Sequence, residues 1–176
     1  MPAMTNYATR QTYAYKDVAR EIARLHILFQ ELDIQQDDKI ALVGDNTPEW
    51  AIAFLATITY GAVIVPILQN FHPDDITYVI SHSESKLLYV EDSYWDRLEE
   101  KDTSGLRAVF SLSDFRCMRQ TKGETLHEVM RQLPTLFKNR YPNGFQHEDV
   151  HFAKKDDQKM CVLNYTSGTT GYSKGV

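Results

Sequence analysis

The chain has 176 residues, of which 43% are hydrophobic and 24% are charged, the composition of an ordinary globular domain. The formal net charge of −5 and the lack of a visible basic face argue against a nucleic-acid-binding protein. Two cysteines, Cys117 and Cys161, are too few and too far apart for a disulfide framework or a zinc ribbon, and they fit a reduced, cytoplasmic setting. Cys161 lies in an apolar run, so we expect it to be a small core residue.

The first predicted helix covers about residues 16–32, because apolar residues recur there at helical spacing. These residues are Val18, Ile22, Leu25, Phe29 and Leu32. The apolar run at 39–44 is long enough only for a buried strand. A second helix follows, with Thr47 able to cap it, Pro48 at its first position and Gly61 ending it in a left-handed turn.

One stretch has nearly the length of a membrane span. Residues 50–68, WAIAFLATITYGAVIVPIL, carry no charge. Gly61 and Pro66 interrupt this stretch and no basic residue lies close by to anchor it, so we interpret it as a helix, a glycine turn and a buried strand. The first residues, MPAMTNYATRQTYAYKD, lack the apolar middle region of a signal peptide. We therefore expect a soluble protein without a transmembrane segment.

The order of strand and helix then repeats along the chain. Further strands are predicted at 62–67, 86–91, 106–112 and 160–165, and further helices from Pro73, at 93–101 and at about 126–137. Thr125 and Glu128 offer the last helix a capping box, and Pro134 is expected to bend it or end it early. Residues 139–158 are polar and predict a surface loop. This alternation predicts an α/β fold, a doubly wound and mostly parallel sheet with helices on both faces.

The segment YTSGTTGYSKG follows the final predicted strand and has the composition of a phosphate-binding loop. Glycines let the backbone bend tightly toward a ligand, backbone N–H groups and hydroxyls can donate to phosphate oxygens, and a lysine adds positive charge. The candidate phosphate contacts are Thr166, Ser167, Gly168, Thr169, Thr170, Gly171 and Lys174. Open α/β sheets bind ligands at such positions, beyond the carboxyl ends of strands.

Two other interpretations of this segment are a Walker A loop and a flexible tail. A Walker A loop starting at Gly168 would need glycine at 173 and Ser or Thr at 175, but the chain has Ser173 and Gly175, so the match fails twice. A solvated, flexible tail is also rich in glycine, serine and threonine, and composition alone leaves it open.

The order of the residues favours the phosphate loop. YTSGTTGYSKGV closely resembles the phosphate-loop signature of the adenylate-forming acyl-activating enzymes. Upstream, TYAYKDVAREIARLH resembles the family's opening segment, DDKIALVGDNTPEW its first strand and helix start, and YGAVIVPI its glycine-ended helix and following strand. Ser173 stands where the family usually has proline, which should loosen the backbone without removing a ligand group.

The resemblance implies that the loop holds the β- and γ-phosphates of ATP while a carboxylate attacks the α-phosphorus. Mg²⁺ would assist, and coenzyme A would then take the acyl group from the adenylate as a thioester. Residues 1–176 would be part of the large N-terminal AMP-binding domain, without the C-terminal domain. DNTPEW and the long segment before the loop look most like the long-chain fatty-acid CoA ligases. The acyl pocket would be formed mainly by residues beyond Val176, so these 176 residues do not determine the number of carbon atoms in the acid.

The resemblance also implies that the family's catalytic residues and the glutamate that helps to hold magnesium lie beyond this chain, so we assign neither a catalytic residue nor a metal ligand here. We expect the 176 residues alone to be inactive and to be able to self-associate through an uncovered sheet edge or apolar face. Peripheral membrane association stays open. Two other functions stay open as well: adenylation of another acid or for a carrier protein, and a non-catalytic α/β interaction module.

HEDVH, at 147–151, matches the H-E-x-x-H motif of zinc proteases. That chemistry needs both histidines on one face of a stable helix and a third ligand. Here the motif follows YPNG in a polar segment, so we expect no zinc site. We expect His26, beside the apolar stripe of the first helix, to be a packing residue.

Overall fold

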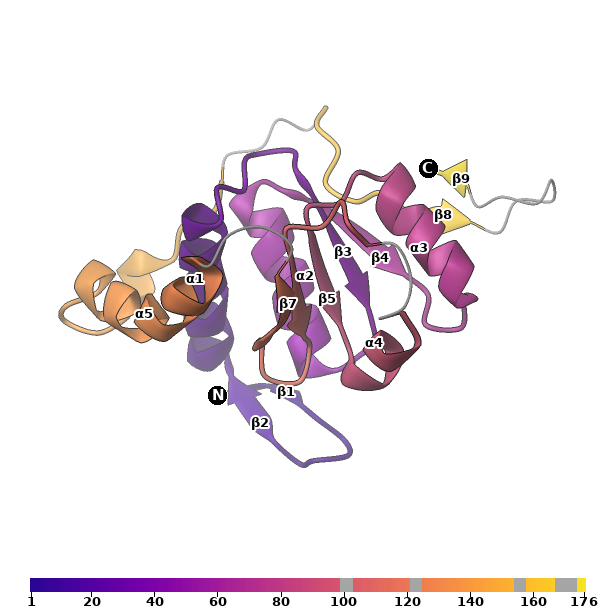
Figure 1. Ribbon diagram of the computed structural model, residues 1–176. Coiled ribbons are helices and arrows are strands. Elements are labelled where there is room, and N and C mark those ends of the chain that lie inside the picture. The colour runs from indigo at the N-terminus through magenta and orange to yellow at the C-terminus, as the bar shows by residue number, and fades with distance from the viewer. Residues whose placement is uncertain (99–102, 121–124, 154–157, 167–173) are drawn as a thin grey trace.

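A computed structural model describes residues 1–98, 103–120, 125–153, 158–166 and 174–176. Its centre is a five-stranded sheet in the order β4-β3-β5-β6-β7 (Figure 1). The strands are β3 (Lys39–Val43), β4 (Val63–Ile67), β5 (Leu87–Val90), β6 (Ala108–Ser111) and β7 (Cys117–Gln120). The first four run parallel, and β7 pairs antiparallel with β6. The predicted mostly parallel sheet is confirmed.

Helices cover both faces of the sheet, as a doubly wound fold requires. They are α1 (Tyr15–Glu31), α2 (Pro48–Tyr60), α3 (Pro73–His82), α4 (Asp92–Leu98) and α5 (Thr125–Arg140). On one face, α1, α2 and α5 pack on alternate strand residues such as Tyr89 and Phe110. On the other face, α3 and α4 pack on the intervening residues such as Val43 and Val90. Burial on both faces explains why these strands are continuous apolar runs.

Helix α2 begins and ends as its sequence predicts. The Thr47 Oγ1 accepts a hydrogen bond from the Trp50 N–H at 3.2 Å, and Pro48 fills the first helical position. Gly61 ends the helix with a φ of 96°, in the left-handed region. The uncharged stretch is thus α2, a glycine turn and β4. Within the described part of the chain, no helix is both long and apolar enough to cross a membrane.

Short strands were not predicted. Strands β1 (Pro2–Thr5) and β2 (Thr12–Ala14) form an antiparallel hairpin beside α1, and β7 lies at one side of the sheet. These strands have three or four residues each and are only partly buried, so they carry no clear apolar pattern.

The chain after β7 differs from the prediction in two places. Helix α5 continues through Pro134 to Arg140, so the early end is wrong. Pro134 is exposed, where water can bond the carbonyl group that proline leaves unpaired. In place of the predicted final strand, residues 161–163 form only backbone hydrogen bonds with the outer edge of β4. Cys161 is exposed there, so its predicted place in the core is wrong. The Thr125 side chain of the predicted capping box lies outside the described residues.

Replacing Gly61 by alanine should destabilise the fold. The left-handed φ disfavours any Cβ, and a Cβ there would lie 3.2 Å from the Ala153 Cβ. We expect Gly61→Ala to lower the free energy of unfolding by about 1–2 kcal/mol in urea titrations. Gly105→Ala is the matched control, because its Cβ would meet no described atom within 4 Å, and it should change stability by less than about 0.5 kcal/mol. Equal effects of the two substitutions would contradict this assignment.

Candidate functional site

The segment before the candidate loop runs along the outer edge of the sheet. The Ile64 N–H donates to the Cys161 carbonyl at 3.0 Å, and the Leu163 N–H donates to the Ile64 carbonyl at 2.9 Å. Val162 thereby pairs with Ile64 in the parallel sense. Because the segment runs in the direction of β4, it delivers the next residues toward the carboxyl edge of the sheet, where open α/β sheets bind ligands.

A small hairpin then carries both ends of the candidate loop. Strand β8 (Tyr165–Thr166) pairs antiparallel with β9 (Lys174–Gly175), and Thr166 is directly opposite Lys174. Asn164 and Val176 close the pair with reciprocal backbone hydrogen bonds of 3.1 and 2.7 Å. The hydroxyl-bearing Thr166 and the cationic Lys174 are both exposed on neighbouring strands.

Tyr165 attaches this hairpin to the body of the protein. Its side chain is 7% exposed and belongs to the core beneath α3, and its hydroxyl lies 2.8 Å from the His82 Nδ1. Burial raises the pKa of the Tyr165 phenol. Figure 1 shows the hairpin beside α3.

Two of the seven candidate phosphate contacts lie among the described residues. Thr166 and Lys174 are brought together across the hairpin. The other five, Ser167, Gly168, Thr169, Thr170 and Gly171, lie outside the described residues. Contact of all seven residues with phosphate stays a prediction from the sequence.

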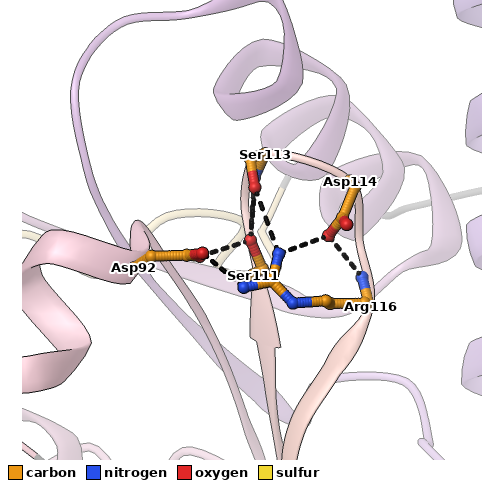
Figure 2. A network of polar contacts seen from close by, with 5 residues as sticks. All are labelled: Asp92, Ser111, Ser113, Asp114 and Arg116. Atoms are coloured by element: carbon orange, nitrogen blue, oxygen red, sulfur yellow. Dashed lines mark hydrogen bonds and ion pairs between the residues drawn. The ribbon is translucent and has the colours of Figure 1, made fainter.

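A second polar group lies at the carboxyl ends of β5 and β6 (Figure 2). The Ser111 Oγ donates to the Asp92 Oδ1 at 2.6 Å, and Arg116 forms ion pairs with Asp92 and, at 3.0 Å, with Asp114. Ser113 completes the network through a hydroxyl contact of 2.7 Å with Ser111. These mutual contacts join the start of α4 to the turn after β6, so we interpret the network as structural.

A neighbouring carboxylate also serves the fold. Glu91 Oε1 accepts the Asp45 N–H at 2.8 Å, which ties the end of β5 to the end of β3, and burial raises the Glu91 pKa. Sequence reasoning missed Glu91 and the Asp92 network, although these residues lie at the ends of the predicted strands 86–91 and 106–112 or directly after them, which is the signal that could have found them.

His26 is a packing residue, as predicted, and the two histidines of HEDVH do not form a zinc-protease helix. His26 Nε2 lies 3.0 Å from the Ala56 carbonyl and 3.1 Å from the Thr59 hydroxyl, as expected for a satisfied core residue. His147–Asp149 form a single 3-10 turn and Val150 is extended, so His147 and His151 do not share a helix face. Among the described residues, no group of three or more His, Cys, Asp and Glu side chains is arranged to hold a metal ion.

Comparison with known proteins identifies the family. The sequence model of the AMP-binding enzymes matches residues 1–176. The chain belongs to the AMP-binding enzyme family.

This AMP-binding chain is 28% identical over 165 residues to long chain acyl-CoA synthetase 4 of Arabidopsis thaliana, covering 92% of the chain and 24% of that protein. It is 28% identical over 141 residues to 4-hydroxybutyrate–CoA ligase 2 of Metallosphaera sedula, covering 80% of the chain and 25% of that protein. It is 26% identical over 172 residues to long-chain-fatty-acid–CoA ligase 6 of Rattus norvegicus, covering 94% and 24%. The chain thus spans about a quarter of the length of these relatives.

Solved structures agree with the α/β fold of the AMP-binding chain. The anthranilate CoA ligase AuaEII in complex with anthranoyl-AMP matches with a TM-score of 0.72 at 18% identity, over 94% of this chain and 29% of that one. ATP-bound MatB from Rhodopseudomonas palustris matches with a TM-score of 0.67 at 20% identity, over 99% and 31%. At these identities the likeness concerns the fold alone.

The Asp92 network should make stability depend on acid pH. Hydrogen bonds from Ser111 and Arg116 hold the Asp92 pKa below its ordinary value of 3.8. A carboxyl with a depressed pKa stabilises the fold above its unfolded pKa and loses this effect as the pH falls through its folded pKa. We expect Asp92→Asn to unfold at lower urea than the wild type at pH 7, with the difference shrinking below about pH 3.8.

The control for this substitution is Asp96→Asn, on the exposed side of the same helix, which should leave the urea midpoint nearly unchanged. A difference between the wild type and Asp92→Asn that stays constant down to about pH 3 would contradict the role of the ionised carboxylate.

Proposed function

We propose that residues 1–176 are the first part of the AMP-binding domain of an ATP-dependent carboxylate–CoA ligase that acts on long-chain fatty acids. The observation that carries the proposal is a phosphate-loop sequence attached at both ends to an ordered hairpin. The hairpin follows a segment that runs parallel to β4 toward the carboxyl edge of the sheet. Family membership over the whole chain supports the same conclusion.

In this proposal the loop binds the β- and γ-phosphates of ATP. The Lys174 ammonium donates hydrogen bonds to phosphate oxygens and offsets their charge, and the Thr166 hydroxyl donates from the facing strand. Ser167, Gly168, Thr169, Thr170 and Gly171 supply further hydroxyl and backbone N–H donors. Donors that are already in place stabilise charge that moves onto the leaving group without reorganising.

The chemistry takes place in two displacements. A carboxylate oxygen forms a bond to the α-phosphorus while the bond from that phosphorus to the bridging oxygen breaks, which gives an acyl adenylate and pyrophosphate. The thiol of coenzyme A then adds to the acyl carbonyl and AMP leaves, with the thiol proton passing to base or solvent. A magnesium ion bound with ATP would neutralise part of the pyrophosphate charge.

The proposal also names the acid that is activated. Long-chain acyl-CoA synthetases from plant and animal cover most of the chain, but a 4-hydroxybutyrate–CoA ligase is equally identical over a shorter stretch. We propose a fatty acid as the substrate, ATP and coenzyme A as the other small-molecule partners and no nucleic acid. Two free cysteines fit a reduced cytoplasmic location, and peripheral association with a membrane that supplies the fatty acid is compatible with it.

Exchange of labelled pyrophosphate into ATP tests the proposal. It is measured with the full-length parent protein, the longer ligase of which residues 1–176 are proposed to be the first part. The panel contains acetate, 4-hydroxybutyrate, octanoate, palmitate and several amino acids. We expect palmitate to drive exchange, and Lys174→Ala to reduce it by about 100-fold because a charged phosphate donor is lost. Lys138→Ala is the matched control, since this exposed lysine lies on α5 and should retain exchange. If no acid drives exchange, the interaction-module interpretation replaces the ligase.

The 176-residue chain alone should not form acyl adenylate. It contains the proposed phosphate loop, but it spans only about a quarter of its relatives, so the groups that hold the acid and the adenosine are expected elsewhere. Palmitate-dependent pyrophosphate release by the purified chain should stay at background. Release that is well above background, and that Lys174→Ala abolishes, would refute this expectation.

A further inference from the structure

The residue directly before the proposed phosphate loop contacts a histidine that is far away in the sequence. The Tyr165 hydroxyl and the His82 Nδ1 lie 2.8 Å apart and are separated by 83 positions. The two rings also meet edge to face, with centroids 5.8 Å apart and an interplanar angle of 89°. Depending on the tautomer, the phenol donates to His82 or accepts from it, and the imidazole fixes the hydroxyl in either case.

His82 is the hydrogen-bond partner that the structure gives to the Tyr165 hydroxyl. Its side chain is almost fully buried in the core between α3 and the sheet. His82 itself is exposed, so its loss would leave the Tyr165 hydroxyl to bond water and would favour movement of the ring toward solvent. Because Tyr165 is the first residue of β8, such movement would carry the adjoining loop end with it.

His82 is itself held in place by its helix. It is the last residue of α3, and the ring of Tyr78, one turn earlier, lies 5.3 Å from its own ring. The helix is fixed at its start by Pro73 and by the His72 side chain, which accepts from the Asp74 N–H at 3.3 Å. The imidazole is thus presented from a capped, ten-residue helix rather than from a loop.

Strand β9, the second strand of the hairpin, packs on the same tyrosine. Gly175 is directly opposite Tyr165, and a Cβ on Gly175 would lie only 3.3 Å from the Tyr165 Cζ. The backbone of β9 therefore packs closely on the phenol ring. One anchored side chain sets the positions of both arms, and so of Thr166 and Lys174.

We propose that His82 is a positioning residue for ATP binding, acting through Tyr165 on the hairpin that presents Thr166 and Lys174. The inference rests on the proposed function and names a residue outside the loop. His82 need not touch ATP. Its effect is to keep the two donors in the geometry that the phosphates require, which lowers the KM for ATP more than it raises kcat.

The test compares five variants of the full-length parent protein. His82→Ala removes the partner and Tyr165→Phe removes only the hydroxyl. His82→Asn keeps a hydrogen-bonding atom near the Nδ1 position, but an asparagine cannot carry a positive charge at the end of the helix. This variant therefore separates the effect of the hydrogen bond from the effect of an interaction with the helix dipole. His127→Ala and Tyr7→Phe are matched controls at exposed positions.

Two readouts are measured. The first is the rate of hydrogen exchange at the backbone amides of Asn164 and Val176. Each amide donates to the carbonyl of the other residue across the hairpin, so its exchange rate reports opening of the hairpin in the absence of ligand. We expect exchange to be about 10-fold faster in His82→Ala and Tyr165→Phe and close to wild type in His82→Asn and both controls. The second readout is the kinetics of palmitate-dependent exchange of pyrophosphate into ATP. Here the KM for ATP should rise about 10-fold in His82→Ala and Tyr165→Phe, while kcat stays within about 3-fold of wild type.

Unchanged amide exchange in His82→Ala would overturn the proposal, whatever the enzyme does. Faster amide exchange with an unchanged KM for ATP would overturn it as well, because the hairpin would then move without affecting ATP. These outcomes leave the proposed ligase intact. If instead the wild type adenylates no acid, the proposed function fails first and the positioning role in ATP binding falls with it.

Discussion

Parallel pairing of β3 with β4 and β5 sets the direction and the placement of the other helices and strands. A parallel ladder aligns the carboxyl ends of its strands, and it must be covered on both faces, which places α1, α2 and α5 on one face and α3 and α4 on the other. The segment 161–163 extends this parallel arrangement by pairing with Ile64 at the outer edge. Strand β8 lies toward the carboxyl edge of the sheet because it follows a segment that runs in the same direction as the strands.

Two polar groups at this edge have different roles. In the Asp92 and Arg116 network the charged groups bond one another, so it stabilises the join between α4 and the turn after β6. At the hairpin, Thr166 and Lys174 face outward as exposed donors while Tyr165 beneath them is buried. A buried anchor under exposed donors is the arrangement expected for a preorganised anion site. In the proposed ligase it would hold phosphate without a large reorganisation on binding.

The sequence predicted the long elements well because their signals are local and strong. Apolar periodicity gave α1, and the cap at Thr47 and the turn at Gly61 gave both ends of α2. Strands β1, β2 and β7 were missed because three or four partly buried residues carry little pattern. Exposure of Cys161 depends on its place at the sheet edge, which an apolar run does not reveal. The contact between His82 and Tyr165 joins segments 83 positions apart, so only the fold could reveal it.

In the proposed ligase, a carboxylate attacks the α-phosphorus of ATP held by this loop. The most direct measurement uses palmitate labelled with ¹⁸O in its carboxylate, the full-length parent protein, ATP and coenzyme A, with mass spectrometry of the products. We expect AMP to gain one ¹⁸O atom and pyrophosphate to gain none, because the labelled oxygen that attacks phosphorus stays on it when the thiol displaces AMP. Appearance of the label in inorganic phosphate with formation of ADP, or palmitoyl-CoA formed with unlabelled AMP, would contradict the account.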